Sequence, residues 1–384
     1  MGELRQVQLL RVAAAASFFL AIINHLLPPK SFAATQLLFD YEFGFTRRGL
    51  FGSLLNFVVG PSVSMQEIYL TCAIITLAAT LGFYFFLLRE LSGSLSGLLL
   101  LILALNSFAF SSFTGNTGYL DGVLLTLVLI ALLSDARSNT GLVVRIAVCF
   151  VGVLIHENML PYFALLFGLE ILLARDADKS AIRAAVLPPI AGIGTVVVLV
   201  LFGEMPADMI AGYVSHIEGK ANFAFDPNST DVAGRTLLEN FALMQDMRGT
   251  TKYWAWVLFD GVPLFLMALF MIWLGQRMLG DQARAIAKIS LVLAVLAPQS
   301  LNLIAFDVVR FGVVSVLCGF LCVAIILRHV DGAASRLQRG FGWPVFTLLL
   351  VLNANVFTIE VNAGSGHTSQ FPWVLVQQLE WMMP

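Results

Sequence analysis

The stretch RIAVCFVGVLIHENMLPYFALLFGLEILLAR, residues 145–175, decides how this chain is threaded through a membrane. It is long for one membrane-spanning helix, which needs about 20 apolar residues, and short for two. If the chain turns at His156, Glu157 and Asn158, the stretch forms a helical hairpin. If it does not turn, every later loop changes sides of the membrane.

The whole chain has the composition of an integral membrane protein. Hydrophobic residues make up 59% of its 384 residues, charged residues only 12%, and the mean hydropathy is +0.87. A net charge of −2 with scattered basic residues excludes a nucleic-acid-binding face, and no GxxxxGK[ST] or HExxH motif indicates nucleotide hydrolysis or zincin-type proteolysis. The cysteines lie inside apolar runs, so we expect them to pack as small hydrophobic residues. They are Cys72, Cys149, Cys318 and Cys322.

Eleven apolar segments have the length and composition of membrane-spanning helices. They are residues 9–27, 67–88, 95–112, 119–134, 141–156, 159–174, 185–203, 254–275, 287–306, 309–327 and 343–358. The run LFGSLLNFVVG, residues 50–60, is too short to cross and indicates an interfacial or re-entrant helix. Residues 1–34 could be a cleaved signal peptide, but the many later spans favour a retained first helix. We therefore predict one all-α polytopic membrane domain over residues 1–384.

The distribution of basic residues favours the hairpin. With a hairpin and a cytoplasmic N-terminus, 14 of the 22 Lys and Arg residues fall in the inner segments and 8 in the outer ones. With a single span, nine basic residues between Arg175 and Arg339 would face outward against five within. The positive-inside rule therefore predicts a turn at residues 156–158, below the outer surface.

Ionisable side chains from distant segments gather at this predicted outer face. The segment DYEFGFTRR, residues 40–48, follows the first span, Asp121 opens the fourth, and the His156-Glu157 pair forms the turn. Asp307 and Arg310 join the ninth and tenth spans. Ionisable groups within or near a membrane are costly, so their convergence at one face is typical of a functional site.

Each of these groups also has a simpler explanation. Asp121 could satisfy free backbone N–H groups at a helix start, and Asp307 and Arg310 could form an ion pair at a helix end. The DYEFGFTRR loop could anchor in the headgroup layer, with its arginines on lipid phosphate. These explanations account less well for the acids Asp40 and Glu42 and for a histidine beside a carboxylate.

The residue types at this face suit group transfer from a lipid phosphate. A carboxylate can act as a general base toward a hydroxyl or bind a divalent cation, and arginine grips phosphate oxygens bidentately. A cavity that opens to lipid would admit a polyprenyl tail. A divalent cation is thus a candidate cofactor, although no ligand set stands out in the sequence.

This arrangement resembles the GT-C superfamily of polytopic membrane glycosyltransferases. The resemblance rests on the Asp-x-Glu pair of Asp40 and Glu42 in the first outer loop, on Asp121 in the second, and on a large later outer loop at about residues 204–252. It implies inverting transfer of a sugar from a polyprenyl-phosphate donor to an envelope glycan, lipid or protein acceptor. The reaction would take place at the periplasmic or exterior face of a bacterial inner membrane. The small size of the chain and the absence of a soluble C-terminal domain depart from many members.

The resemblance also implies roles for individual residues. Asp40 is the expected catalytic base, with Glu42 as second choice; arginines of the set would neutralise the donor phosphate, and the His156-Glu157 pair would orient donor or acceptor. The residues expected to bind substrate are Arg47, Arg48, Asp121, His156, Glu157, Asp307 and Arg310.

The outer loop at residues 204–252 has two interpretations. Aromatic side chains commonly stack on sugars, so an acceptor platform is one; an amphipathic helix on the bilayer followed by an irregular link is the other. The platform residues would be Tyr213, His216, Phe223 and Phe225.

Three other functions stay open. A polysaccharide polymerase or ligase acting on lipid-linked oligosaccharides would use the same outer site. A secondary transporter would show internal repeats and polar residues near mid-membrane. Of these features, the sequence offers only the polar residues Gln299, Ser300 and Asn302. In a non-catalytic assembly protein, the acids would be dispensable.

Overall fold

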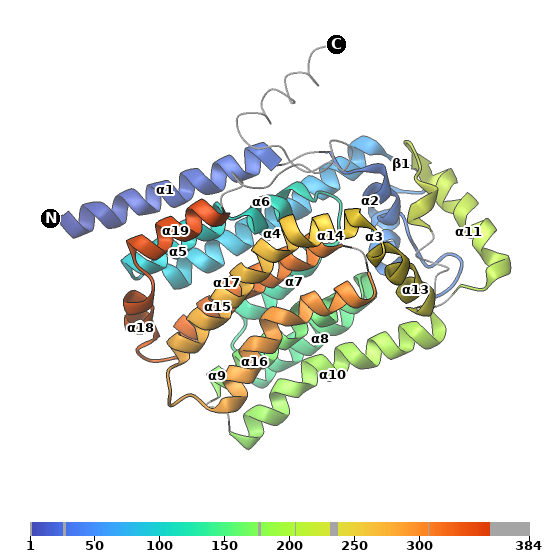
Figure 1. The fold of residues 1–384 in the computed structure, drawn as a ribbon. Helices are drawn as coiled ribbons and strands as arrows, with labels where there is room; N and C mark the ends of the chain where they lie inside the picture. Colours follow the sequence, from blue (N-terminus) through green and yellow to red (C-terminus); the bar gives the residue numbers. More distant parts are fainter. Residues whose placement is uncertain are drawn as a thin grey trace, which may run out of the picture.

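The computed structural model describes residues 2–25, 28–175, 178–203, 205–230, 237–305 and 307–353. Helices dominate these residues (Figure 1). They are α1 (Gly2–His25), α2 (Ser31–Gln36), α3 (Gly49–Val59), α4 (Met65–Leu91), α5 (Leu95–Leu105), α6 (Phe108–Gly115), α7 (Asp121–Leu133), α8 (Asn139–Ile155), α9 (Leu165–Ala174), α10 (Lys179–Phe202), α11 (Ala207–Lys220), α13 (Leu237–Arg248), α14 (Thr251–Trp256), α15 (Val262–Leu279), α16 (Ala285–Leu296), α17 (Val308–His329), α18 (Ala333–Gly340) and α19 (Trp343–Asn353). Short helical turns are η1 (Leu160–Ala164), η2 (Pro227–Ser229), η3 (Val257–Gly261) and η4 (Ala297–Leu303), and the strands are β1 (Val63–Ser64) and β2 (Ala221–Asn222).

Six of the described helices are long and apolar enough to cross a membrane, and the pair α5 and α6, bent by 44°, passes the same test together. The six are Arg5–Ile23, Met65–Leu91, Lys179–Phe202, Val262–Leu279, Ala285–Leu303 and Val308–His329. α10 exposes Ile190, Val200 and Leu201 by half or more of their surface, as a lipid-facing helix does. Several other predicted spans coincide with shorter apolar helices, and residues 354–358 of the last lie outside the described residues. The count of eleven therefore stays a prediction.

The chain turns at residues 156–158, as predicted. α8 ends at Ile155, and η1 then leads into α9. Arg145 in α8 pairs with Glu170 in α9 at 2.6 Å, so the two helices meet again far from the turn. The predicted hairpin is confirmed, whereas the assignment of the turn to the outer side of a membrane stays a prediction.

Helix α17 is the centre of the bundle. It packs against α4, α6, α9, α15 and α16, and its residues from Phe311 to Ile326 are all buried. Apart from Ser315, these side chains are apolar or cysteine, the composition of a helix that is enclosed all round. The four cysteines of the chain are free and buried, as predicted. Arg310 lies near one end of α17 and Arg328 near the other, and we name the ends of the bundle after them.

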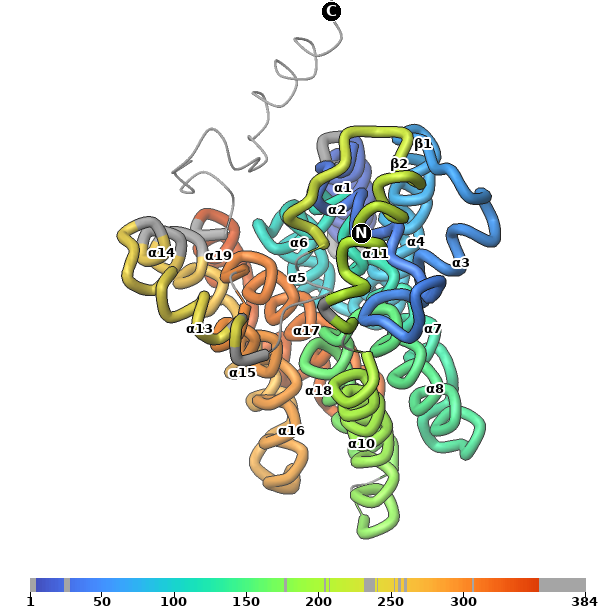
Figure 2. The backbone as a smooth tube through the Cα atoms, turned by 90° about the vertical axis from the view of Figure 1, so that its right-hand side faces the viewer, coloured from blue at the N-terminus to red at the C-terminus, as the bar shows by residue number. Residues whose placement is uncertain are grey.

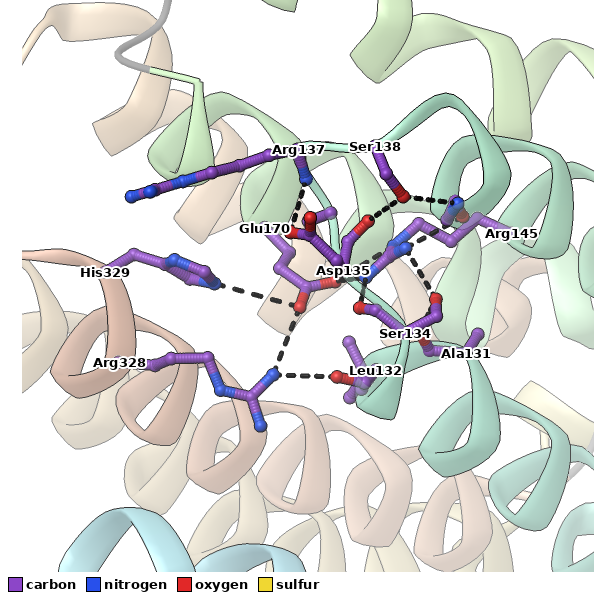
Figure 3. A network of polar contacts seen from close by, with 12 residues as sticks. Ala131, Leu132, Ser134, Asp135, Arg137, Ser138, Arg145, Glu170, Arg328 and His329 are labelled. Atoms are coloured by element: carbon purple, nitrogen blue, oxygen red, sulfur yellow. Dashed lines mark hydrogen bonds and ion pairs between the residues drawn. The ribbon is translucent and has the colours of Figure 1, made fainter.

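A network of buried charges holds the Arg328 end together (Figure 3). Arg145 and Glu170 are fully buried, and Arg328 reaches Glu170 at 3.4 Å. Arg328 also pairs with Glu90 of α4 at 2.7 Å. Arg145 also donates to the hydroxyl of Ser134 at 3.0 Å. An unpaired charge in such an interior costs several kcal/mol. The network therefore fixes α4, α8, α9 and α17 relative to one another.

The opposite, Arg310 end is covered by short elements. α2, α3 and α11 gather there, at the right of Figure 1, and Figure 2 looks onto this end. Val63 of β1 pairs with Ala221 of β2, which ties the end of α11 to the start of α4. The predicted short helix at residues 50–60 corresponds to α3, which leaves Phe57 89% exposed, as an interfacial helix would.

At the Arg310 end, α3 packs tightly on the chain before it at Gly52. A Cβ atom there would lie 2.0 Å from the carbonyl oxygen of Phe39, a distance that forces one of the two segments to move. Only glycine therefore allows α3 to pack on the segment that leads into Asp40.

We expect Gly52→Ala to lower the midpoint of thermal unfolding of the purified protein, although alanine favours helices more than glycine does. Overpacking of this kind costs about 1–3 kcal/mol. Gly93→Ala is the control, because a Cβ at Gly93 meets nothing within 4 Å. Equal midpoints for the two variants would contradict the tight contact.

Candidate functional site

The DYEFGFTRR loop folds so that Asp40 points inward and Glu42 outward. Asp40 is 2% exposed, whereas the side chain of Glu42 is 61% exposed. The backbone N–H of Glu42 donates to Oδ1 of Asp40 at 3.2 Å, the local bond by which aspartate stabilises turns. The hydroxyl of Thr46 donates to the carbonyl oxygen of Asp40 at 3.0 Å. The loop thus closes on itself around a buried carboxylate.

Helix α11 brings two further polar side chains to Asp40. Nε2 of His216 lies 3.2 Å from Oδ2 of Asp40 and 3.4 Å from Oε2 of Glu42. The ammonium group of Lys220, itself 5% exposed, forms an ion pair with the same Oδ2. Positions 216 and 220 share one face of the helix because they are four apart. We name Asp40, Glu42, His216 and Lys220 the acid–lysine cluster.

The surroundings of Asp40 keep its carboxyl group ionised at neutral pH. Burial alone would raise its pKa, but the bonds from Lys220, the Glu42 amide and His216 together outweigh burial and lower the pKa below the usual value. The folding stability that this shift contributes is present above the unfolded pKa, near 3.8, and is lost as the pH falls through the lower folded pKa.

Three residues of the cluster could in principle share a metal ion. One donor atom each from Asp40, Glu42 and His216 lie within 4.8 Å of one another, a set of oxygen and imidazole ligands. The ammonium group of Lys220 rests on Oδ2 of Asp40, an oxygen that the ion would need, and two cations at this range repel strongly. The three side chains therefore favour the ammonium group of Lys220 over a divalent cation.

Removal of the ammonium group should therefore create a cation site. We expect Mn²⁺ to raise the unfolding midpoint of Lys220→Ala by a few degrees and to leave the wild type unchanged, because an ion that binds only the folded state stabilises it. The double variant Lys220→Ala/Glu42→Gln, which lacks one ligand, is the control and should lose most of the gain. A wild type stabilised as much as Lys220→Ala would show that Lys220 does not exclude the ion.

Arg48 connects the same loop to the hairpin turn. Its guanidinium group binds Glu157 through Nη2 at 2.5 Å and Nε at 3.2 Å, and its Nη1 reaches Gln36 at 3.4 Å. The backbone of Arg48 is left-handed, with φ of 62°, which costs about 1–2 kcal/mol for a residue with a side chain. The bidentate bond to Glu157 offsets this cost and directs the arginine into the protein.

Arg310 makes an equivalent pair with Asp121. Its Nε lies 2.5 Å from Oδ2 and its Nη2 2.8 Å from Oδ1, and the guanidinium group lies 4.6 Å from the centre of the Tyr119 ring. Asp307 is farther away, at 3.6 Å, and its Oδ1 accepts the backbone N–H of Arg310. Asp307 thus caps α17 and also forms the ion pair with Arg310 that its simpler explanation predicted. Asp121, whose simpler explanation was a cap, makes no capping bond in α7 and pairs with Arg310 instead.

His156 lies between the two arginine pairs. It is 2% exposed, its Nδ1 lies 3.4 Å from Oε2 of Glu157, and its Nε2 lies 3.4 Å from Nη2 of Arg310. The backbone N–H of Asn158 donates to Nδ1 at 3.2 Å. Burial and the neighbouring guanidinium groups disfavour a charge on the ring. We name Arg48, Glu157, His156, Arg310 and Asp121 the arginine–histidine chain; it links α3, the hairpin turn, α7 and α17.

The structure therefore brings the predicted site residues into two groups at one end of the bundle. Two residues of the predicted set lie outside these groups: Arg47, half-buried in the same loop, and Asp307, which caps α17 beside Arg310. Sequence reasoning missed Lys220 altogether and considered His216 only as a sugar-stacking residue. The available signal was their spacing of four on an amphipathic segment.

The predicted acceptor platform needs a correction at Tyr213. This side chain is fully buried and packs edge-on against Phe39 and Phe43, with ring centres 5.9 Å apart in both pairs. It is part of the core under α11 and is not accessible to a sugar. Phe223 and Phe225 are partly buried against the same core.

The helices and their apolar surfaces define an integral membrane protein. The chain belongs to the family described as uncharacterised membrane protein Rv1490, whose model matches residues 6–270. The matched part includes the acid–lysine cluster and the hairpin turn and ends before Asp307 and Arg310. No curated protein and no solved structure shows a significant match to the chain.

Proposed function

We propose that this protein is a GT-C-like membrane glycosyltransferase that moves a sugar from a polyprenyl-phosphate donor to an envelope glycan, lipid or protein acceptor. The observation that carries the proposal is the contact of Asp40 with Lys220, a buried ionised carboxylate and a cation on one oxygen. Transfer from a lipid phosphate needs a base for the acceptor hydroxyl and a positive charge for the departing phosphate. The distribution of basic residues favours a periplasmic or exterior position for the Arg310 end in a bacterial inner membrane.

In the proposed step, Asp40 takes the proton of the acceptor hydroxyl. The hydroxyl oxygen bonds to the anomeric carbon on the side opposite the phosphate, and the bond between that carbon and the phosphate oxygen breaks. Polyprenyl phosphate leaves with the electron pair of this bond, and the anomeric configuration inverts. The ammonium group of Lys220, which contacts Asp40 before the donor binds, turns to the donor phosphate and stabilises the negative charge that develops there.

The two arginines of the arginine–histidine chain suit positioning better than phosphate binding. Arg48 is already paired with Glu157 and Arg310 with Asp121, both bidentately. A phosphate would have to displace a carboxylate and leave it without its partner, which is most costly for the buried Asp121. In this proposal the arginine–histidine chain holds the DYEFGFTRR loop and the start of α17 in place, and Lys220 binds the phosphate.

A polar patch on η4 is a candidate for binding the sugar. Nε2 of Gln299 and Oδ1 of Asn302 are buried without a hydrogen-bond partner among the described residues. η4 packs against η1, which follows the hairpin turn, and against α17. Sugar hydroxyl groups both donate and accept hydrogen bonds, so they would satisfy these two atoms.

The direct test is transfer of labelled sugar from a panel of polyprenyl-phosphate sugars to envelope acceptors by the purified protein in lipid. We expect Asp40→Asn to lower the rate at least a hundredfold, the usual contribution of a general base. Glu42→Gln is the matched control and should retain most activity, because Glu42 is largely exposed.

The outcomes separate the competing functions. Full activity of a folded Asp40→Asn variant would remove Asp40 from the mechanism. A ladder of products from one acceptor would identify a polymerase that uses the same site, and no transfer from any donor would contradict the glycosyltransferase proposal.

The pH dependence tests Lys220 separately. The pKa of Asp40 is lowered in the wild type. Activity that needs the ionised carboxylate should therefore persist until the pH falls below the ordinary pKa of an aspartate, near 3.8. In Lys220→Met that support is lost, the pKa rises, and the acid limb of the profile of kcat/KM against pH should move to higher pH. Lys179→Met, at an exposed lysine of α10, should leave the limb in place; an unshifted limb in Lys220→Met would contradict the coupling.

A further inference from the structure

A cavity of about 880 Å³ lies at the Arg328 end of the bundle, opposite the candidate active site. Its walls come from the ends of α9, α15 and α17, the start of α16, and α18. The volume is in the range of small-molecule sites. The proposed glycosyl transfer uses none of its residues.

Basic side chains predominate among the charged groups of this cavity. The basic ones are Arg277, Arg284, Arg336, Arg339 and His329, and the acidic ones are Asp281 and Asp331. The basic side chains come from α15, α17, α18 and the turn before α16, so their gathering around one space is a property of the fold. Such a surplus of positive charge favours an anionic ligand.

Arg336 has a structural role in the cavity wall. It donates to the carbonyl oxygens of Met278 at 2.6 Å and Asp331 at 2.9 Å and so joins the end of α15 to the turn after α17. The turns after α15 and α17 each contain a glycine in the left-handed region, Gly280 with φ of 78° and Gly332 with φ of 71°. The wall is therefore a built feature that carries its own fixed guanidinium group.

Arg277 and Arg339 are exposed and suited to contact a ligand directly. The guanidinium group of Arg277 lies 5.5 Å from the centre of the Trp273 ring, which orients it without neutralising its charge. Arg339 is in the last turn of α18, on the same cavity. Two arginines on one space match the oxygens of a phosphate group.

Part of the remaining wall is apolar. Leu173, Ala283 and Val330 line it with partly exposed side chains, over the buried Leu172, Leu279 and Ala287, and Gln276 and Gln282 are its polar members. A soluble anion gains nothing from these side chains, whereas the acyl chain of a lipid buries apolar surface against them. This combination favours a phosphate carried by a lipid.

We propose that this cavity binds the phosphate group of an anionic membrane lipid, at the face opposite the candidate active site. Basic pockets between helix ends at the cytoplasmic face are suited to such head groups, and the positive-inside rule predicts that face for the Arg328 end. The shared chemistry is a phosphate anion, which a free phosphate would also offer.

The test is native mass spectrometry of the full chain in detergent, titrated with phosphatidylglycerol and, in parallel, with diacylglycerol, which has the same tails and no phosphate. We expect clear preference for phosphatidylglycerol. The double variant Arg277→Gln/Arg339→Gln should bind it about thirtyfold more weakly, since each basic residue near a membrane surface contributes about 1 kcal/mol. Arg183→Gln removes one charge from an exposed position of α10 outside the cavity and should change binding less than twofold.

Competition with inorganic phosphate distinguishes the two sources of the anion. Displacement of phosphatidylglycerol only at a large excess of phosphate supports the lipid, and displacement at equal concentration supports a site for soluble phosphate instead. Equal binding of diacylglycerol and phosphatidylglycerol by the wild type would overturn the proposal without reliance on any variant. If Arg183→Gln weakened binding as much as the double variant, the lipid would be held by general attraction to the basic face, and the proposed specific site would be overturned.

Discussion

Buried ion pairs at the two ends of α17 are the constraint on which the rest of the structure depends. In a membrane, helices gain little from the hydrophobic effect when they associate, because lipid is as apolar as their side chains. The smooth apolar surface of α17 would allow the helix to slide or rotate against its neighbours. Arg310 on Asp121 at one end and Arg328 on Glu90 at the other prevent this, because any shift would leave a buried charge unpaired.

The same arrangement leaves the middle of α17 almost without polar groups. Between Arg310 and Arg328, the buried residues 311–326 of α17 offer one side-chain hydroxyl, that of Ser315. A transporter needs polar groups near mid-membrane to pass its substrate from one side to the other. The apolar middle of α17 favours chemistry at one end over passage through the bundle, and this supports an enzyme over a transporter as the proposed function.

Much of the fold could be predicted from the sequence, and for physical reasons. Long apolar runs form helices, and the bias of basic residues identified the hairpin at residues 156–158. Span lengths are less predictable, because a helix such as α9 has only 10 residues and is almost entirely buried among other helices. A helix sheltered by protein need not match the thickness of the bilayer. Hydropathy alone does not distinguish such helices from complete spans.

The candidate site was predictable in its members but not in its pairings. Ionisable residues are unusual in apolar segments, so the sequence alone indicates Asp40, Asp121 and Arg310. Their partners depend on tertiary contacts, since Arg310 and Asp121 are 189 positions apart. Helix α11 shows most clearly what the sequence does not predict. An amphipathic helix is expected to turn its polar face to water. Here, however, His216 and Lys220 contact Asp40.

The pair of Asp40 and Lys220 sets opposing demands on the proposed reaction. A lowered pKa keeps Asp40 ionised, but it also makes the carboxylate a weak acceptor for a proton. A bound donor would relieve this conflict, because its negative phosphate competes with Asp40 for the ammonium group of Lys220. As that group turns toward the phosphate, the pKa of Asp40 rises and the carboxylate becomes a stronger base. In the proposed function the donor therefore activates the base that the acceptor needs, and without donor the base stays neutralised by Lys220.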